Sequence, residues 1–126
     1  MPERLPGKRV LIVEDNPALA FDINDIFSDH GAEVVGPAMD LPTGMQLVRD
    51  NNLDAAVLDI DLGGEFVWPL ARELKGHKVP FVFVSAECTD RLPEDFFEAT
   101  CLDKPAPSDM ILTTVANLIH PPVRQG

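Results

Sequence analysis

Short apolar runs alternate along the chain with segments in which apolar residues recur every three or four positions. Apolar runs bounded by turn residues are typical of buried strands, and the second spacing is typical of amphipathic helices. The runs predict five strands, at residues 8–14, 33–38, 54–59, 79–85 and 100–103. The helical spacing predicts helices at about residues 17–30, 41–52, 67–75 and 108–120. This alternation predicts an α/β domain, in which a parallel sheet is covered by helices on both faces.

Several helix starts are marked by residues that favour a first turn. Asn16 is a good N-cap residue, and Pro17 behind it suits the first helical position. Pro69 is likewise tolerated only in a first turn, which places the start of the third helix at about residue 67 or 68. Ser108 is expected to cap the last helix.

The chain between the fourth and fifth strands leaves little room for another helix. Pro93 lacks an amide proton and disfavours helix at the residue before it. A regular helix can therefore run only from about Pro93 to Glu98, which is under two turns. Because so short a helix is marginal without packing, we expect a short or irregular fourth helix on a mobile face.

Charged and polar residues gather where the predicted strands end. Glu14 and Asp15 follow the first strand, and Asp59 ends the third. Ser85 ends the fourth strand, and Lys104 follows the fifth. Ligands of open parallel sheets bind outside the carboxyl ends of the strands, so these side chains should share one rim. Carboxylates a few ångströms apart repel by about 4 kcal/mol per pair near a protein surface, so they require a cation or a proton.

Magnesium suits such a rim, because it prefers oxygen ligands and binds through one or two carboxylates with water completing its shell. Together with the ammonium of Lys104 and the hydroxyl of Ser85, it would bind a phosphoryl group, whose charge spreads over three oxygens. Asp59 is then predicted to be the nucleophile that forms an acyl phosphate.

Composition excludes several other functions. The chain has 126 residues, of which 45% are hydrophobic and 25% charged, and this is ordinary usage for one globular domain. The net charge of -11 argues against binding nucleic acid or an anionic membrane through a basic face. No basic leader opens the chain, and no apolar run approaches the length of a membrane span.

The cysteines and histidines indicate no further site. Cys88 and Cys101 form no CxxC pair, and the three histidines lie far apart in the sequence. We therefore expect neither a disulfide framework nor a zinc site, and a reducing cytoplasmic location fits best. Cys101 is expected to be a small buried hydrophobic residue.

Four motifs resemble those of bacterial response-regulator receiver domains and occur in the same order: VLIVEDN, AAVLDID, FVFVSA and LDKP, over about Arg9 to His120. The resemblance implies a flavodoxin-like, doubly wound sheet with the strand order 2-1-3-4-5. It also implies a single domain over residues 1–126, with a core of about 8–120 and loose tails at 1–7 and 121–126.

The resemblance assigns a role to each site residue. Asp59 would be the phosphoacceptor. Ser85 would supply the switch hydroxyl, and Lys104 would be the lysine that binds the phosphate. The Mg2+ ligands would be Glu14, Asp15, Asp59 and the backbone carbonyl of Asp61. Such a protein takes its phosphoryl group from a sensor histidine kinase or a phosphotransfer protein. It hydrolyses its own acyl phosphate slowly but is not an enzyme in the usual sense. Whether this chain forms a homodimer is left open by the resemblance.

A narrower resemblance rests on VVGPA, LDIDLGGE and PFVFVSA, which are similar to receivers found with histidine kinases of the HWE class. Those receivers carry a PFxFATG-like fourth strand, and this chain has FVSA where they have FATG. Receivers usually carry Tyr or Phe where this chain has Cys101, and Met-Pro where it has Leu62 and Gly63. Asp61 and Glu87 add negative charge close to the site residues.

Two other functions compete. LDIDL also resembles the DxD opening of haloacid-dehalogenase phosphatases, but there the remaining metal carboxylates follow the lysine, whereas Glu14 and Asp15 precede the nucleophile. A pseudo-receiver that acts only as an interaction module is disfavoured, because no site residue is missing.

Overall fold

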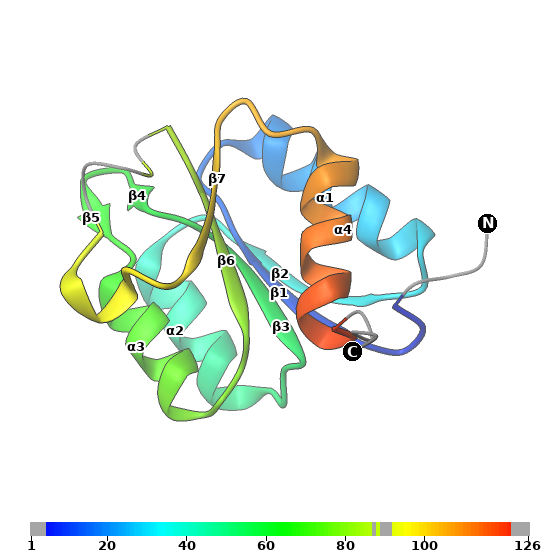
Figure 1. Cartoon of the computed structure of the whole chain (residues 1–126), viewed down its shortest axis with the longest axis horizontal. Coiled ribbons are helices and arrows are strands. Elements are labelled where there is room, and N and C mark those ends of the chain that lie inside the picture. Colours follow the sequence, from blue (N-terminus) through cyan, green and yellow to red (C-terminus); the bar gives the residue numbers. More distant parts are fainter. Residues whose placement is uncertain (1–4, 87, 89–91, 122–126) are drawn as a thin grey trace, which may run out of the picture.

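Five parallel strands form the central sheet of the computed structural model, which describes residues 5–86, 88 and 92–121 (Figure 1). They lie in the order β2-β1-β3-β6-β7. Their bounds are Arg9–Val13 for β1, Glu33–Ala38 for β2, Ala55–Asp59 for β3, Phe81–Ser85 for β6 and Thr100–Asp103 for β7. The predicted order 2-1-3-4-5 is this order once β4 and β5, which lie outside the sheet, are set aside. The flavodoxin-like α/β fold is therefore confirmed.

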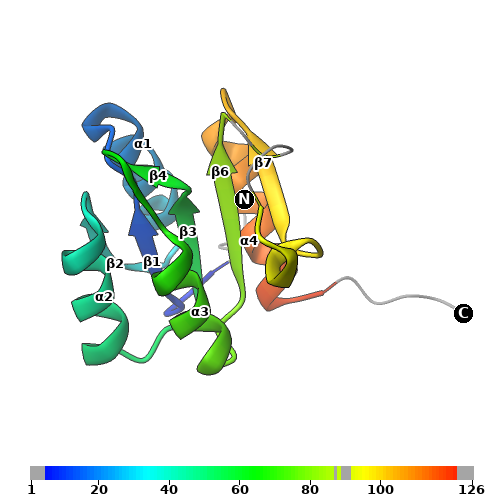
Figure 2. The same ribbon diagram turned by 90° about the vertical axis from the view of Figure 1, so that its left-hand side faces the viewer.

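Helices cover both faces of the sheet (Figure 2). Helices α1 (Pro17–Asp29) and α4 (Ser108–Ile119) pack on one face, and α2 (Leu41–Asp50) and α3 (Trp68–Gly76) pack on the other. Each face buries its own apolar cluster, because alternate residues of a strand point to opposite sides. Within the described residues, no helix combines the length and the apolar character needed to cross a membrane.

The central strand β3 is buried at all five positions. Val57 belongs to the apolar cluster under α1 and α4, whereas Ala56 and Leu58 belong to the cluster under α2 and α3. A strand with parallel neighbours and helices on both sides needs apolar residues on both faces. The central position of β3 thus explains why Ala55–Leu58 are all apolar, and the carboxylate of Asp59 appears only where the strand ends.

The helix caps confirm one prediction and correct another. The side chain of Asn16 accepts a hydrogen bond from the amide of Leu19 at 3.3 Å, as expected for the N-cap of α1. Ser108, in contrast, does not cap α4, because the carbonyl of Pro107 already accepts a hydrogen bond from the amide of Met110 at 3.0 Å. Pro107 is the N-cap and Ser108 is the first helical residue, so the prediction was wrong by one position.

A small antiparallel hairpin, which the sequence analysis did not predict, follows the end of β3. It consists of β4 (Asp61–Leu62) and β5 (Glu65–Phe66). Gly63 and Gly64 form its turn with φ angles of +68° and +96°. Glycine adopts two such angles in succession at little cost, as a tight hairpin turn requires.

The segment between β6 and β7 contains a single 3-10 turn, η1 (Glu94–Phe96), among its described residues. The expectation of a short or irregular fourth helix is therefore confirmed, although the turn is shorter than the predicted stretch to Glu98. The buried side chain of Phe96 anchors the turn, and Arg72 of α3 forms an ion pair with Asp95 at 2.9 Å.

Aromatic rings connect this turn with the hairpin and the sheet. Trp68, the first residue of α3, lies 6.1 Å from Phe66, 5.6 Å from Phe83 and 5.8 Å from Phe96 between ring centroids. Phe66 belongs to β5, Phe83 to β6 and Phe96 to η1. One indole ring therefore contacts a phenylalanine from each of these elements.

The beginning of the chain is less loose than expected. Leu5 is fully buried in the apolar cluster under α1 and α4, and its amide donates a hydrogen bond to the carbonyl of His30 at 3.2 Å. The amide of Gly7 donates to the carbonyl of Gly31 at 2.9 Å. The predicted tail at 1–7 is therefore wrong for residues 5–7, because one leucine side chain completes the apolar cluster under α1.

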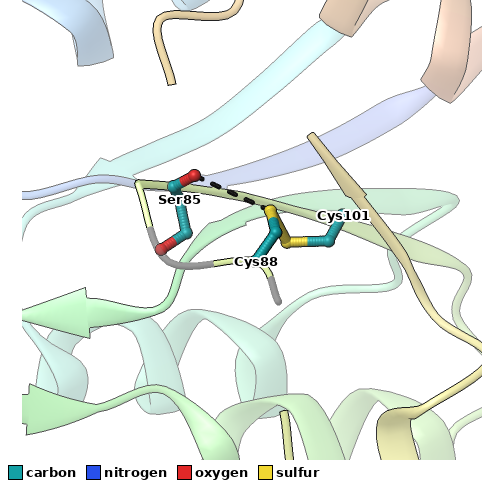
Figure 3. The surroundings of a disulfide bond; sticks show 3 residues. All are labelled: Ser85, Cys88 and Cys101. Carbon is teal, nitrogen blue, oxygen red and sulfur yellow. Dashed lines mark hydrogen bonds between the residues drawn. A yellow bond between two sulfur atoms is a disulfide. The ribbon is translucent and has the colours of Figure 1, made fainter. Parts of the chain in front are cut away.

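Cys88 and Cys101 form a disulfide bond (Figure 3). The expectation of no disulfide framework was based on the number of cysteines and on their spacing in the sequence. Pairing depends instead on distance in space, and the two Cα atoms lie 5.7 Å apart, within the range that a disulfide spans. The prediction of no disulfide is therefore wrong, as is the view of Cys101 as merely a small buried hydrophobic residue.

Candidate functional site

The carboxyl ends of the strands bring the predicted site residues to one edge of the sheet. Along this edge, Asp59 pairs in register with Val84, and Ser85 pairs with Asp103. The amide of Lys104 donates a hydrogen bond to the carbonyl of Ser85 at 2.9 Å, which fixes the residue after β7 against the end of β6. Backbone pairing, rather than side-chain contact alone, therefore sets the positions of these residues.

Carboxylates from two strand ends converge at this edge. Glu14, Asp15 and Asp59 each offer an oxygen atom, and these atoms lie within 4.8 Å of one another. Glu14 is 1% exposed and Asp59 is 6% exposed, whereas Asp15 is exposed to solvent. Glu14 also accepts a hydrogen bond from the amide of Asn16 at 3.0 Å, which orients its carboxylate.

Lys104 provides the positive charge at the cluster. Its Nζ atom lies 2.9 Å from Oε1 of Glu14 and 3.3 Å from Oδ2 of Asp59. Burial alone would lower the pKa of Lys104, but the hydrogen bond to Glu14 and the charge of Asp59 outweigh burial and raise it. The ammonium group therefore stays charged beside the carboxylates.

Asp59 has the most perturbed environment of these groups. Burial, followed by the charge of Glu14, raises the pKa of Asp59 to about 8, and the charge of Lys104 only partly opposes this. In the absence of another cation, Asp59 thus tends to hold a proton. A bound cation would favour the ionised carboxylate, which is the nucleophilic form.

A pocket of about 380 Å³ opens above the acidic cluster. It is lined by Asp15, Asp59, Asp61, Gly63, Gly64, Ser85, Ala86 and Lys104. The hairpin turn forms one wall, where the side chain of Asp61 accepts a hydrogen bond from the amide of Gly64 at 2.7 Å. Ser85 is 4% exposed, on the wall that continues from β6.

The donor set of the cluster fits a hard divalent cation. When Glu14, Asp15 and Asp59 are ionised, they carry three negative charges, and Lys104 offsets one of them. The remaining charge favours a cation, and clustered carboxylate oxygens with an exposed member suit Mg2+, which keeps part of its water shell.

The structure brings together the side chains that the sequence analysis selected for this rim: Glu14, Asp15, Asp59, Ser85 and Lys104. Their chemical roles stay predictions, as does the backbone carbonyl of Asp61 as a metal ligand. Glu87 lies outside the described residues. The sequence analysis missed the hairpin wall, although paired glycines between extended residues are a signal for a two-residue turn.

Comparison with known families shows a match over most of the chain. The family described as the response regulator receiver domain matches residues 10–116. A comparison with curated proteins found no match.

Several solved structures are similar to this chain. SdrG from Sphingomonas melonis Fr1 is 32% identical, with a TM-score of 0.76 over 90% of this chain and 97% of SdrG. The response regulator PhyR from Brucella abortus is 25% identical, with a TM-score of 0.77 over 93% of this chain and 50% of PhyR. The receiver domain of the sensor histidine kinase PA1611 from Pseudomonas aeruginosa PAO1 is 22% identical, with a TM-score of 0.76. The match covers 90% of this chain and 98% of that domain, whose structure holds a magnesium ion in the active site cleft.

Proposed function

Because the chain belongs to the response regulator receiver domain family, we propose that it carries a phosphoryl group on Asp59 in two-component signalling. The observation that supports this most directly is the position of Asp59. Its carboxylate ends a buried strand, lines an open pocket and lies 3.3 Å from the Nζ atom of Lys104.

Transfer to Asp59 forms a bond between a carboxylate oxygen and phosphorus, and it breaks the bond between phosphorus and a nitrogen of the donor's histidine. The ammonium of Lys104 and the hydroxyl of Ser85 would stabilise the negative charge on the phosphoryl oxygens. Asp59 must lose its proton to attack, and the positive charge of Lys104 favours that loss.

Glu14, Asp15 and Asp59 would hold Mg2+, with the backbone carbonyl of Asp61 as a further ligand. The bound ion would neutralise charge on the phosphoryl oxygens and favour the ionised form of Asp59. The support is the convergence of hard oxygen donors with excess negative charge, together with the magnesium ion of the PA1611 receiver domain.

The phosphoryl donor is a sensor histidine kinase or a phosphotransfer protein, in the cytoplasm. The residues VVGPA, LDIDLGGE and PFVFVSA favour a kinase of the HWE class. Helix α1 supplies a contact surface for it, since Phe21 is 53% exposed there beside the exposed carboxylate of Asp25. The protein itself acts as a receiver that slowly hydrolyses its own acyl phosphate.

Acetyl phosphate tests this function without the kinase. In the presence of Mg2+ it should add the mass of one phosphoryl group to the intact protein, and Asp59→Asn should abolish the addition. Asp103→Asn is the matched control, because Asp103 is an exposed strand-end aspartate outside the pocket, and this variant should be labelled like the wild type.

Labelling of Asp59→Asn to the same extent as the wild type would show that another residue is the acceptor. If the folded wild type stays unlabelled by acetyl phosphate and by histidine kinases, the chain acts as an interaction module instead.

A further inference from the structure

In the sequence, both cysteines of the disulfide lie between Ser85 and Lys104, the two residues proposed to contact the phosphoryl group. Cys88 follows Ser85 by three residues, and Cys101 precedes Lys104 by three residues. The register places Cys101 beside Phe83 of β6. The bond therefore ties the segment that leaves β6 to the strand that leads to Lys104.

The two oxidation states hold this segment by different interactions. The Sγ atom of Cys88 lies 3.7 Å from the backbone carbonyl oxygen of Ser85 (Figure 3). A disulfide sulfur carries no proton, so in the oxidised protein this is only a van der Waals contact. A reduced thiol can donate a hydrogen bond to the same oxygen. Reduction thus exchanges a covalent tether to β7 for a weak hydrogen bond to the backbone of Ser85.

The bond lies at the margin of the core. Cys88 is 7% exposed, whereas Cys101 is half-buried on β7, which is an edge strand of the sheet. Disulfides that occur in reducing compartments are usually transient, and they are catalytic or redox-sensing rather than structural. Cys88 and Cys101 are the only cysteines of the chain, so no other thiol competes for either partner.

We propose that Cys88 and Cys101 form a reversible redox modification site whose substrate is a dithiol, and that its oxidation state controls how the site around Asp59 takes up a phosphoryl group. The thiolate of a dithiol attacks one sulfur and forms a mixed disulfide, and its second thiolate then displaces the protein sulfur. Two electrons and two protons pass to Cys88 and Cys101, and the dithiol becomes a disulfide. The effect on Asp59 rests on the proposed function.

The tether should oppose phosphoryl uptake. Ser85 and Ala86 line the pocket, so an anion that binds above Asp59 is expected to shift these two residues, and Cys88 follows them closely in the chain. Binding shifts a protein toward the arrangement that the ligand prefers, and a covalent link to β7 limits that shift. Reduced protein is therefore expected to bind beryllofluoride, a mimic of the phosphoryl group, at least about fivefold more tightly than oxidised protein.

The test compares the full chain in its oxidised form and after native treatment with dithiothreitol. Iodoacetamide and mass spectrometry should find no alkylated cysteine before treatment and two after it. Calorimetric titration with beryllofluoride and Mg2+ should then give the tighter binding in the reduced form. The variant Cys88→Ala/Cys101→Ala is the control, since its affinity should not respond to the dithiol while its circular dichroism shows an intact fold.

A bond that survives excess dithiothreitol in the native protein would overturn the inference, and so would equal affinity of the two forms. Tighter binding by the oxidised form would also overturn it. If neither form binds beryllofluoride or is labelled by acetyl phosphate, the proposed function fails and the control over Asp59 falls with it.

Discussion

Asp59 is a buried acid next to another acid, and this gives the stability of the protein a definite pH dependence. Because the pKa of Asp59 is raised to about 8 by burial and by Glu14, the folded protein keeps a proton that the unfolded chain releases near its ordinary pKa of 3.8. Between these two values the unfolded state binds fewer protons than the folded state. Unfolding therefore becomes easier as pH rises through this window.

We expect the melting temperature of the metal-free protein to fall between about pH 5 and about pH 8. Asp59 can lower the free energy of unfolding by at most about 1.4 kcal/mol per pH unit in this window. Asp59→Asn should flatten this slope, because the amide does not titrate. Mg2+ should flatten it as well, because it competes with the proton. A melting temperature that rises with pH in the wild type but not in Asp59→Asn would contradict the assignment.

The exposed carboxylate of Asp15 allows metal binding to be separated from folding. Asp15→Asn should weaken Mg2+ binding, yet it should stabilise the metal-free protein by up to about 1 kcal/mol, because it removes repulsion with the carboxylate of Glu14. Asp22→Asn is the control, since Asp22 is an exposed aspartate of α1 outside the cluster. Thermal melting with and without Mg2+ measures both effects, and a wild type that Mg2+ does not stabilise would refute the metal site.

At the scale of elements, the backbone amides of the segment around η1 should be poorly protected against hydrogen exchange. Only a single 3-10 turn is present there among the described residues, and Phe97 is 67% exposed beside the buried Phe96. Hydrogen exchange over residues 92–100 should be faster than over α2, which serves as the internal control, and beryllofluoride should slow it. Protection equal to that of α2 in the free protein would contradict this.

The elements that the sequence predicted well are those whose pattern depends on local burial. The run Ala55–Leu58 had to be a central strand because it is apolar on both faces, and the carboxyl ends of parallel strands then placed Asp59 and Lys104 together. The disulfide could not be predicted in this way, because its cysteines lie thirteen positions apart in the sequence and only the return path of the chain brings them together. Leu5 was missed for the same reason, since the apolar cluster that buries it consists of residues from the strands and from α1 and α4, which come later in the chain.

At the scale of the whole molecule, excess acidic charge should make stability depend on salt. The chain has 21 acidic and 10 basic side chains, so the compact state experiences net repulsion that dissolved ions screen. Raising sodium chloride from about 10 mM to about 500 mM should raise the urea midpoint by the equivalent of about 1 kcal/mol. Mg2+ at matched ionic strength should stabilise further, because it also binds the cluster. A midpoint that falls with salt would contradict this account.

The packing of Trp68 also determines how the molecule behaves in a spectrometer. The chain contains one tryptophan and no tyrosine, so its ultraviolet emission comes almost entirely from a single indole. That indole touches Phe66 beside the pocket wall, Phe83 in the sheet and Phe96 in the 3-10 turn. A rearrangement of the hairpin that holds Phe66, or of the 3-10 turn that holds Phe96, should change the intensity or wavelength of the emitted light. The unlabelled protein thus carries its own optical reporter, which can follow a change at the site in real time.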